Sequence, residues 1–329
     1  MGETILQVKN LCTVLDLSSG TVPVVNDVSF DVGVGETLGI VGESGSGKSM
    51  TALSIMQVLP KPIGRIASGQ ILLEGTDLVG MSNQQMGQIR GREIGMILQD
   101  PHTSLNPVFT VGNQVIEALE INNPGTARKT LRAHAIDALK KVNVADAERR
   151  IDAYPHQMSG GMKQRVVGAI AIAGAPKVII ADEPTTALDV TIQLQYLQLL
   201  RDIQDETGTA IIFITHDLGI VANLCHRLVV MYGGKIVESG TVADVFGAPS
   251  HPYTEALLKS VPSVDQKLDR LYAIDGQPPA LISDRVGCSF APRCPYALDI
   301  CRNQVPQESD ALSGAKSHRA SCWNMERTT

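Results

Sequence analysis

The sequence predicts an α/β protein with a mostly parallel core sheet, an antiparallel β subdomain, an inserted helical subdomain and a cysteine-containing C-terminal extension. Strand and helix patterns alternate along residues 178–232, which implies parallel strands with helices on both faces. A glycine-rich stretch at residues 42–49 follows an apolar strand and opens a helix, as phosphate-binding loops do. Beyond residue 250 the sequence becomes rich in proline, cysteine and loop residues. We therefore expect a main domain at 1–250 and an extension at 251–329.

The composition favours a well-packed protein that acts together with other proteins. Of the 329 residues, 43% are hydrophobic and 19% are charged, which is typical of a globular core. The net charge of −6 argues against a nucleic-acid partner, since nucleic-acid binders usually carry a basic surplus. No apolar run approaches the roughly 20 residues that span a bilayer, and residues 1–20 have no signal-peptide pattern. We expect any membrane role to come through a partner protein.

Strands are expected on both sides of the glycine-rich stretch. Alternation over residues 24–32 places Val28, Phe30 and Val32 on one face, as in an antiparallel strand. Residues 37–41 form a short apolar run that suits a buried parallel strand. Further expected elements are a helix that ends at Pro60 and strands over residues 70–74 and 94–98.

A helical block interrupts the strands and predicts a subdomain at about residues 100–175. Apolar residues recur at helical spacing between residues 110 and 153. The elements expected after this block are helices at 162–173 and 191–206, strands at 178–181, 210–215 and 228–232, and a helix after Asp217.

Residues 42–49 fit the pattern Gly-x4-Gly-Lys-Ser, which suits a nucleoside triphosphate. Glycines let backbone N–H groups turn inward around phosphates, and the helix N-terminus adds the positive end of a dipole. Lys48 supplies a positive charge to the β- and γ-phosphates, and the Ser49 hydroxyl is expected to ligate Mg²⁺. The alternative is a flexible glycine-serine turn. The residues expected to bind ATP here are Gly42, Ser44, Gly45, Gly47, Lys48, Ser49 and Met50.

Two acids end the apolar strand at residues 178–181, at the edge where doubly wound sheets hold ligands. We expect Asp182 to hold Mg²⁺ through water and Glu183 to polarise the attacking water as the general base. The alternative is that the two carboxylates end the strand simply to meet solvent.

Other polar residues stand at similar places in the predicted fold. Gln99 and His216 each follow an apolar strand, where an ordinary strand-end residue is the alternative interpretation. The turn Ser159-Gly160-Gly161 opens a helix and offers a hydroxyl and backbone donors to phosphate. A plain helix cap would have the same sequence.

The order of these motifs, with Ala187-Leu188-Asp189 after the two acids, resembles the ATP-binding cassette (ABC) family. The resemblance implies that Gln99 contacts Mg²⁺ and water and that His216 reaches the γ-phosphate, so both are expected to serve catalysis. It also implies that the Ser-Gly-Gly signature contacts ATP held by a second subunit and that Asp189 lies in the loop crossing the dimer interface. The signature departs from the common form, because Met158 and Met162 replace leucine and glutamine.

Further segments are similar to the ATPases of dipeptide, oligopeptide and nickel importers. They are residues 99–107, 154–157 and 251–254 and the cysteine-bearing stretch 287–301. The resemblance implies an ATPase that energises import of di- or oligopeptides at the cytoplasmic face of the inner membrane. Its expected partners are two membrane permease subunits, a second related ATPase subunit in a heterodimer or homodimer, and indirectly an external solute-binding protein. Import of nickel or glutathione is an alternative within the same branch.

Three other classes of ATPase fit less well. A DNA-repair ATPase would carry a long coiled coil, whereas only 59 residues separate Gln99 from Ser159, without sustained heptads. A ribosome-associated ATPase usually holds two cassettes in one chain, and a small-molecule P-loop kinase would lack the Ser-Gly-Gly signature.

The sequence does not identify the residue that contacts adenine. Many cassettes stack the base on an aromatic side chain before the glycine loop, yet Phe30 is the only aromatic residue there and faces the predicted core. The candidates for an aliphatic contact are Leu15, Leu17 and Val22.

Four cysteines crowd into the last 42 residues, namely Cys288, Cys294, Cys301 and Cys322. A cytosolic chain keeps its thiols reduced, which favours a metal over disulfides. The intervening stretches of five, six and twenty residues differ from the Cys-x2-Cys spacing common in zinc sites. We expect a structural iron–sulfur cluster or zinc, and the resemblance to peptide importers favours a four-iron cluster. The alternative is four unconnected cysteines in a loop-rich tail.

Overall fold

The computed structural model describes residues 3–186, 188–261, 272–279, 286–311, 313–315 and 317–326. Two compact units make up the chain, and each is described by itself. Unit 1 comprises residues 1–5, 32–36 and 81–213, and unit 2 comprises residues 6–31, 37–80 and 214–329. Unit 2 therefore contains both the glycine loop and the C-terminal segment.

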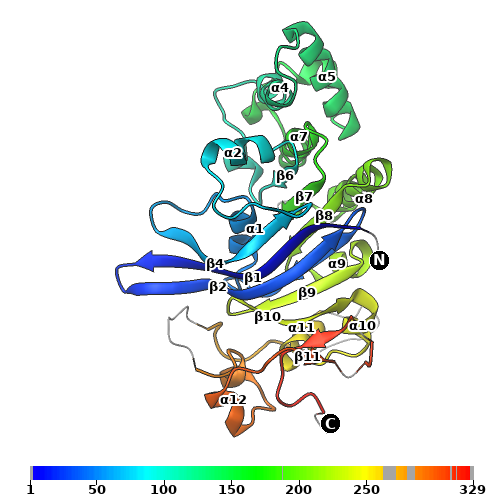
Figure 1. Ribbon diagram of the computed structural model, residues 1–329. Helices are drawn as coiled ribbons and strands as arrows, with labels where there is room; N and C mark the ends of the chain where they lie inside the picture. Colours follow the sequence, from blue (N-terminus) through cyan, green and yellow to red (C-terminus); the bar gives the residue numbers. More distant parts are fainter. Residues whose placement is uncertain are drawn as a thin grey trace. The chain divides into compact units, whose positions relative to one another are not determined.

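One sheet, which lies almost entirely in unit 2, has the strand order β2-β1-β4-β5. Its strands are β1 (Thr4–Leu17), β2 (Gly20–Gly33), β4 (Gly64–Leu73) and β5 (Thr76–Asp77). Strand β4 pairs antiparallel with both β1 and β5. Val28, Phe30 and Val32 are all buried, which confirms the face predicted from their alternation. Figure 1 shows β1 and β2 as two long neighbouring arrows at the start of the chain.

A second group of strands in unit 2 carries the glycine loop. Strand β3 (Thr37–Val41) pairs parallel with β9 (Arg227–Tyr232), as the sequence predicted for two buried strands. Strand β10 (Lys235–Thr241) pairs antiparallel with β9, and two short strands near the C-terminus, β11 (Ser309–Asp310) and β12 (Arg319–Ala320), extend this group. None of these last three strands was predicted from the sequence.

The helices of unit 2 are short. They are α1 (Lys48–Ile55), α9 (Leu218–Leu224), α10 (Val242–Gly247), α11 (Pro252–Ser260), α12 (Asp299–Asn303) and the 3₁₀ turn η2 (Ala291–Arg293). Helix α1 ends one turn earlier than predicted, because Gln57 takes a left-handed conformation with φ +49° before Pro60 is reached.

Unit 1 contains the predicted helical block and the two acids. Strands β6 (Ile94–Ile97) and β7 (Val178–Asp182) pair in parallel, and most of β8 (Ala210–Thr215) belongs to this unit. Helices α4, α5 and α7 pack against one another, and Figure 1 shows them in green. The helices of unit 1 are α2 (Asn83–Ile89), α3 (Pro101–Ser104), α4 (Val111–Asn122), α5 (Arg128–Lys141), α6 (Ala147–Arg150), η1 (Pro155–Gln157), α7 (Gly160–Ile172) and α8 (Val190–Thr207).

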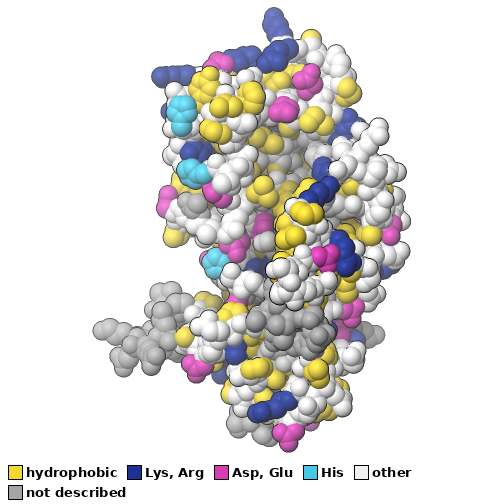
Figure 2. Space-filling model, turned by 90° about the vertical axis from the view of Figure 1, so that its left-hand side faces the viewer, with side chains coloured by type: hydrophobic (Ala, Val, Ile, Leu, Met, Phe, Trp, Pro, Cys, Tyr) yellow, Lys and Arg dark blue, Asp and Glu magenta, His cyan; other side chains and the backbone are white. Residues whose placement is uncertain are grey.

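The surface mixes charged and apolar side chains. Figure 2 shows hydrophobic side chains among polar ones over much of one face, with lysine and arginine gathered towards the top of the view. Helix α5 carries many of the basic residues of unit 1, in the sequence RKTLRAHAIDALKK. Among the described residues, no helix has both the length and the apolar character needed to cross a bilayer.

Candidate nucleotide site

The glycine loop begins where a buried strand ends. All five residues of β3 are buried, and the chain leaves the strand at Gly42, whose φ is +152°. A Cβ atom on Gly42 would lie 2.2 Å from the carbonyl oxygen of Met231, and one on Gly47 would lie 2.7 Å from that of Val24. Because backbone approaches this closely at both positions, the loop can take its path only with glycine there.

Lys48, the first residue of α1, turns its side chain back over the loop. The residue is 5% exposed, and Nζ donates hydrogen bonds to the carbonyl oxygens of Gly42 (2.7 Å) and Glu43 (2.9 Å). The ammonium therefore lies beside the helix N-terminus. A triphosphate placed there would meet a positive charge and backbone N–H groups together.

The other predicted loop residues surround this position. Ser44 and Gly45 form the turn that precedes α1, and Gly45 has a φ of +78°. Ser49 and Met50 follow Lys48 in the first turn of the helix and are half-buried. The structure thus places this contiguous set of predicted residues around one helix N-terminus.

Two residues from the C-terminal segment contact the loop at Glu43, and neither was predicted from the sequence to have a role. The Glu43 backbone N–H donates to the Tyr253 hydroxyl at 2.7 Å. The Arg293 guanidinium donates to both carboxylate oxygens of Glu43, with Nη1–Oε2 at 2.6 Å and Nη2–Oε1 at 3.0 Å. Burial raises the pKa of the Tyr253 hydroxyl above its ordinary value, so this group stays neutral. A tyrosine in the segment 251–254 was visible in the sequence, but its contact with the loop was not.

His216 also belongs to unit 2, where it follows the last residue of β8 and is exposed. The next residue, Asp217, caps α9 by accepting hydrogen bonds from the backbone N–H groups of Gly219 (2.8 Å) and Ile220 (3.2 Å). This cap fixes the chain direction just after the histidine.

In unit 1 the register of two parallel strands brings Gln99 and Glu183 together. Ile97 pairs with Ala181, so the residues two positions beyond each leave the same edge of the sheet. Gln99 Nε2 donates to Glu183 Oε2 at 2.9 Å, and Thr186 Oγ1 donates to the same oxygen at 3.1 Å. The carboxylate is therefore held by two neutral donors, one placed by the parallel register and one from three residues further along the same segment.

The two acids at the end of β7 have different surroundings. Asp182 is 5% exposed, whereas Glu183 is half-buried. Glu183 has a φ of +45°, a left-handed conformation that is costly for a side chain of this kind. Strained backbone of this sort is found preferentially at functional sites.

The Ser159-Gly160-Gly161 turn and Asp189 both cap helices of unit 1. Ser159 Oγ accepts from the Met162 N–H at 3.3 Å at the start of α7, and Asp189 accepts from the Ile192 N–H at 3.0 Å at the start of α8. A Cβ on Gly161 would lie 3.1 Å from Ile192 Cγ2, so the first turns of α7 and α8 pack together. Ala187 lies outside the described residues. Ser159 thus caps helix α7, as the helix-cap alternative predicted. Its contact with the phosphate of ATP stays a prediction.

The candidates for an adenine contact differ in exposure. Phe30 is 8% exposed, which confirms that it packs into the core, and Val22 is 7% exposed. Leu17 is 42% exposed and Leu15 is half-buried, so of the three aliphatic candidates these two are accessible.

The four clustered cysteines line one small cavity of about 10 Å³ in unit 2, together with Phe290 and Trp323. Burial raises the pKa of Cys288 and, to about 11, that of Cys294. None of the four is in a disulfide. Within the described part of the chain, no three side chains of His, Cys, Asp or Glu are arranged as metal ligands. The sulfur atoms thus converge on one cavity without ligand geometry.

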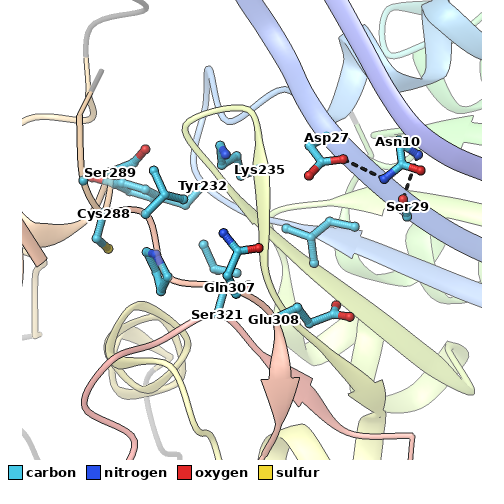
Figure 3. Close-up of a pocket in the computed structure, with 15 residues that line it drawn as sticks. Asn10, Asp27, Ser29, Tyr232, Lys235, Cys288, Ser289, Gln307, Glu308 and Ser321 are labelled. Atoms are coloured by element: carbon cyan, nitrogen blue, oxygen red, sulfur yellow. Dashed lines mark hydrogen bonds between the residues drawn. The ribbon is translucent and has the colours of Figure 1, made fainter. Parts of the chain in front are cut away.

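A larger pocket of about 210 Å³ lies between β1 and β2 on one side and the segment 287–308 on the other (Figure 3). Asn10 donates to Asp27 Oδ1 and to Ser29 Oγ, both at 2.8 Å, at its β1/β2 side. Cys288 is the predicted site residue that lines it.

The parallel strands, the glycine loop with its buried lysine and the acid pair define a P-loop ATPase of the ATP-binding cassette class. Comparison with known families agrees: residues 25–186 match the ABC transporter family, and residues 237–301 match the oligopeptide/dipeptide transporter C-terminal region. The chain belongs to the ABC transporter family, among its peptide-transport ATP-binding proteins.

Two relatives and one solved structure are similar to this chain in sequence and in fold. The dipeptide transport ATP-binding protein DppD of Bacillus subtilis is 47% identical, covering 99% of this chain and 96% of that protein. The oligopeptide transport ATP-binding protein OppD of the same organism is 47% identical, covering 97% of this chain and 88% of that protein. The dimeric ATP-binding cassette MJ0796, bound to ADP and Pi after hydrolysis, is 26% identical with a TM-score of 0.66, over 72% of this chain and 99% of that one.

Proposed function

We propose that this chain hydrolyses ATP to energise the import of di- or oligopeptides through a membrane permease. The observation that carries the proposal is the combination in one chain of a lysine-bearing phosphate loop and a C-terminal region of the peptide-transporter type. The peptide-transport relatives support the solute class, because both align along nearly the whole chain. Nickel or glutathione import is the second candidate within the same branch.

Different residues of the chain bind the phosphates, bind Mg²⁺ and accept the proton during hydrolysis. The loop from Gly42 to Met50 binds the phosphates, with Lys48 as the positive charge. Ser49, Gln99 and Asp182 hold Mg²⁺, which when bound offsets the negative charge of the phosphate oxygens. Glu183 takes up the proton of the attacking water, and Gln99 keeps its carboxylate in place through the amide hydrogen bond.

Five further residues complete the proposed site. His216 reaches the terminal phosphate as a donor. The Ser159-Gly160-Gly161 turn presents the hydroxyl and N–H groups of a helix start to ATP that is bound by a second ATPase subunit. Asp189, at the start of the neighbouring helix, faces the same interface.

The proposed partners are two permease subunits, a second related ATPase subunit and, indirectly, an external solute-binding protein, at the cytoplasmic face of the inner membrane. Two exposed apolar side chains nine and ten residues after Gln99 in the sequence support a permease contact, because Val108 is 71% exposed and Phe109 is 51% exposed. Asn106 fixes this loop, since its Oδ1 accepts from the Val108 N–H at 3.1 Å. The proposed domain organisation is a cassette at 1–250 followed by an extension at 251–329.

The test is ATP hydrolysis by the full chain purified with and without its co-expressed permeases, in vesicles that contain a peptide-binding protein. We expect hydrolysis to rise with the permeases and to rise again when a dipeptide or a short oligopeptide is added. Stimulation by nickel or glutathione, but not by peptides, would favour the second candidate. ATP hydrolysis that is unaffected by permeases and every solute would contradict an importer function.

We also propose that Cys288, Cys294, Cys301 and Cys322 hold a four-iron cluster, with zinc as the alternative. Their convergence on one cavity supports this, since four thiolates suit either metal. The role is structural: ligation would stabilise a loop-rich segment whose apolar core is small. Protein purified without oxygen should be brown, and Cys294→Ser should remove the visible absorption while Cys12→Ser leaves it unchanged. Colourless protein without iron or zinc by elemental analysis would contradict it.

A further inference from the structure

The Arg293 guanidinium uses all of its hydrogen-bond donors inside the protein. Its side chain is 5% exposed. A guanidinium carries five N–H donors. Nη1 donates to Glu43 and to the Tyr232 hydroxyl (3.2 Å), Nη2 donates to Glu43 and to the Ile274 carbonyl (3.2 Å), and Nε donates to the Asp275 carbonyl (2.9 Å). A side chain with every donor engaged is fixed in place, and it fixes Glu43 in turn.

An aromatic cluster of Tyr232, Tyr253 and Phe290 packs against Arg293. The ring of Tyr232 lies 4.5 Å from that of Tyr253 and 5.2 Å from that of Phe290, centroid to centroid. The Arg293 guanidinium carbon lies 5.8 Å from the centre of the Tyr232 ring, within the range of a cation–π contact. The Arg293 backbone N–H also donates to the Phe290 carbonyl at 2.9 Å. Both ends of the arginine are therefore attached to one packed group.

The turn that carries Arg293 carries two of the clustered cysteines as well. The Ala291 N–H donates to the Cys288 carbonyl at 3.1 Å, and the Cys294 N–H donates to the Ala291 carbonyl at 3.3 Å. The cysteine cavity and the contact with Glu43 consequently share one support.

Glu43 in turn shapes the lysine end of the loop. Its carbonyl oxygen accepts from Lys48 Nζ at 2.9 Å and from the Ser46 N–H at 3.2 Å. Its own N–H is bound by Tyr253 and its carboxylate by Arg293. Every polar group of Glu43 is thus engaged. Its N–H and carboxylate bind the C-terminal segment, and its carbonyl oxygen binds the Lys48 ammonium.

We propose that Arg293 is a positioning residue for nucleotide binding, through which the C-terminal segment holds Glu43, and with it Lys48, in the geometry that receives phosphate. The inference rests on the proposed function, because it assumes that the loop binds ATP. It assigns the extension a direct part in nucleotide affinity. Arg293 itself does not touch the nucleotide, so its loss acts on ATP binding more than on the chemical step.

The experiment measures ATP affinity and ATPase kinetics of the full chain carrying Arg293→Gln, Glu43→Gln or both. Losing charge-assisted hydrogen bonds to the loop should raise the Kd and KM for ATP by roughly tenfold, while kcat at saturating ATP stays within about twofold. Because the two side chains act through one contact, the double variant should bind ATP no more weakly than either single variant. Arg319→Gln is the matched control, since Arg319 pairs with exposed carboxylates elsewhere in the segment.

Glu43→Gln keeps the test valid if Arg293→Gln fails to fold, because it leaves the other three acceptors of Arg293 in place. Unchanged ATP affinity in Glu43→Gln, or effects of the two substitutions that multiply in the double variant, would overturn the inference. Wild-type protein that does not bind ATP at all would overturn the proposed function as well, which separates the two failures.

Discussion

The side-chain amide of Gln99 donates a 2.9 Å hydrogen bond to the carboxylate of Glu183, across the carboxyl ends of two parallel strands. The bond links the residue that starts the helical part of the chain to the proposed general base. Glu183 also has a left-handed backbone conformation, with φ +45°. A base held by two donors and a strained backbone has few alternative positions, which is the preorganisation that catalysis requires.

Gln99→Ala should lower ATP turnover by about tenfold and leave ATP affinity, measured without Mg²⁺, within about twofold. The amide orients the Glu183 carboxylate but lies outside the loop that binds the phosphates. Steady-state hydrolysis and equilibrium binding of a labelled nucleotide measure the two effects separately. The control is Gln198→Ala, whose amide donates to Asp202 on the exposed face of α8. Equal losses in the two variants would show that the Gln99 contact has no special role.

Ser159→Arg should block hydrolysis by the assembled ATPase and leave nucleotide binding by the isolated chain almost unchanged. The side chain is expected to contact ATP held by the other subunit, so its own site is spared. Ser82→Arg is a matched control, because Ser82 likewise caps a helix of unit 1 by accepting from a backbone N–H. Each substitution should cost about 1 kcal/mol of capping. A large loss of ATP affinity in isolated Ser159→Arg would mean that the signature serves its own site.

Glu238→Ala should destabilise the fold by about 3–5 kcal/mol, because it removes one member of a buried pair. Glu238 Oε1 lies 2.8 Å from His318 Nε2, and both side chains are fully buried. The carboxylate also accepts from the backbone N–H groups of Ser250 (2.6 Å) and His251 (2.9 Å), and the substitution removes both of these hydrogen bonds. Urea unfolding measures the free energy.

The exposed pair in the same segment provides the comparison for that measurement. Glu308 lies 3.5 Å from Arg319 with its side chain 52% exposed. Glu308→Ala should change the free energy of unfolding by less than about 1 kcal/mol. Similar costs for the two substitutions would show that the Glu238 pair does not anchor the C-terminal segment.

Local patterns in the sequence were sufficient to predict the strand ends and turns that carry most of the candidate site residues. Short apolar runs fixed β3, β6, β7 and β8 to within two residues, because buried parallel strands have few polar interruptions. Each polar residue just beyond such a run was then expected at one edge of a sheet. That placement predicts that Gln99 and Glu183 lie close together. It does not predict which atom donates or the distance of the hydrogen bond.

Features that depend on distant parts of the chain were missed. Strand β10 follows a two-residue turn, Gly233-Gly234, in which both residues have positive φ, and this dipeptide was a usable hairpin signal. Arg293 and Glu43 are 250 residues apart, so no periodicity or local motif could pair them. The accessible candidates for adenine, half-buried Leu15 and exposed Leu17, were likewise indistinguishable from buried Val22 until their burial was known.

ATP hydrolysis by Glu183→Gln, compared with that of the separately purified wild-type chain under the same conditions, tests the central claim most directly. The substitution removes the base but leaves Lys48 and the loop unchanged, so kcat should fall by at least about a hundredfold while ATP still binds. The bound but unhydrolysed ATP should also hold the chain in a closed complex with its partner ATPase subunit. Glu206→Gln, an exposed glutamate on α8, should hydrolyse ATP normally. Hydrolysis by Glu183→Gln at a rate near that of the wild type would contradict the account.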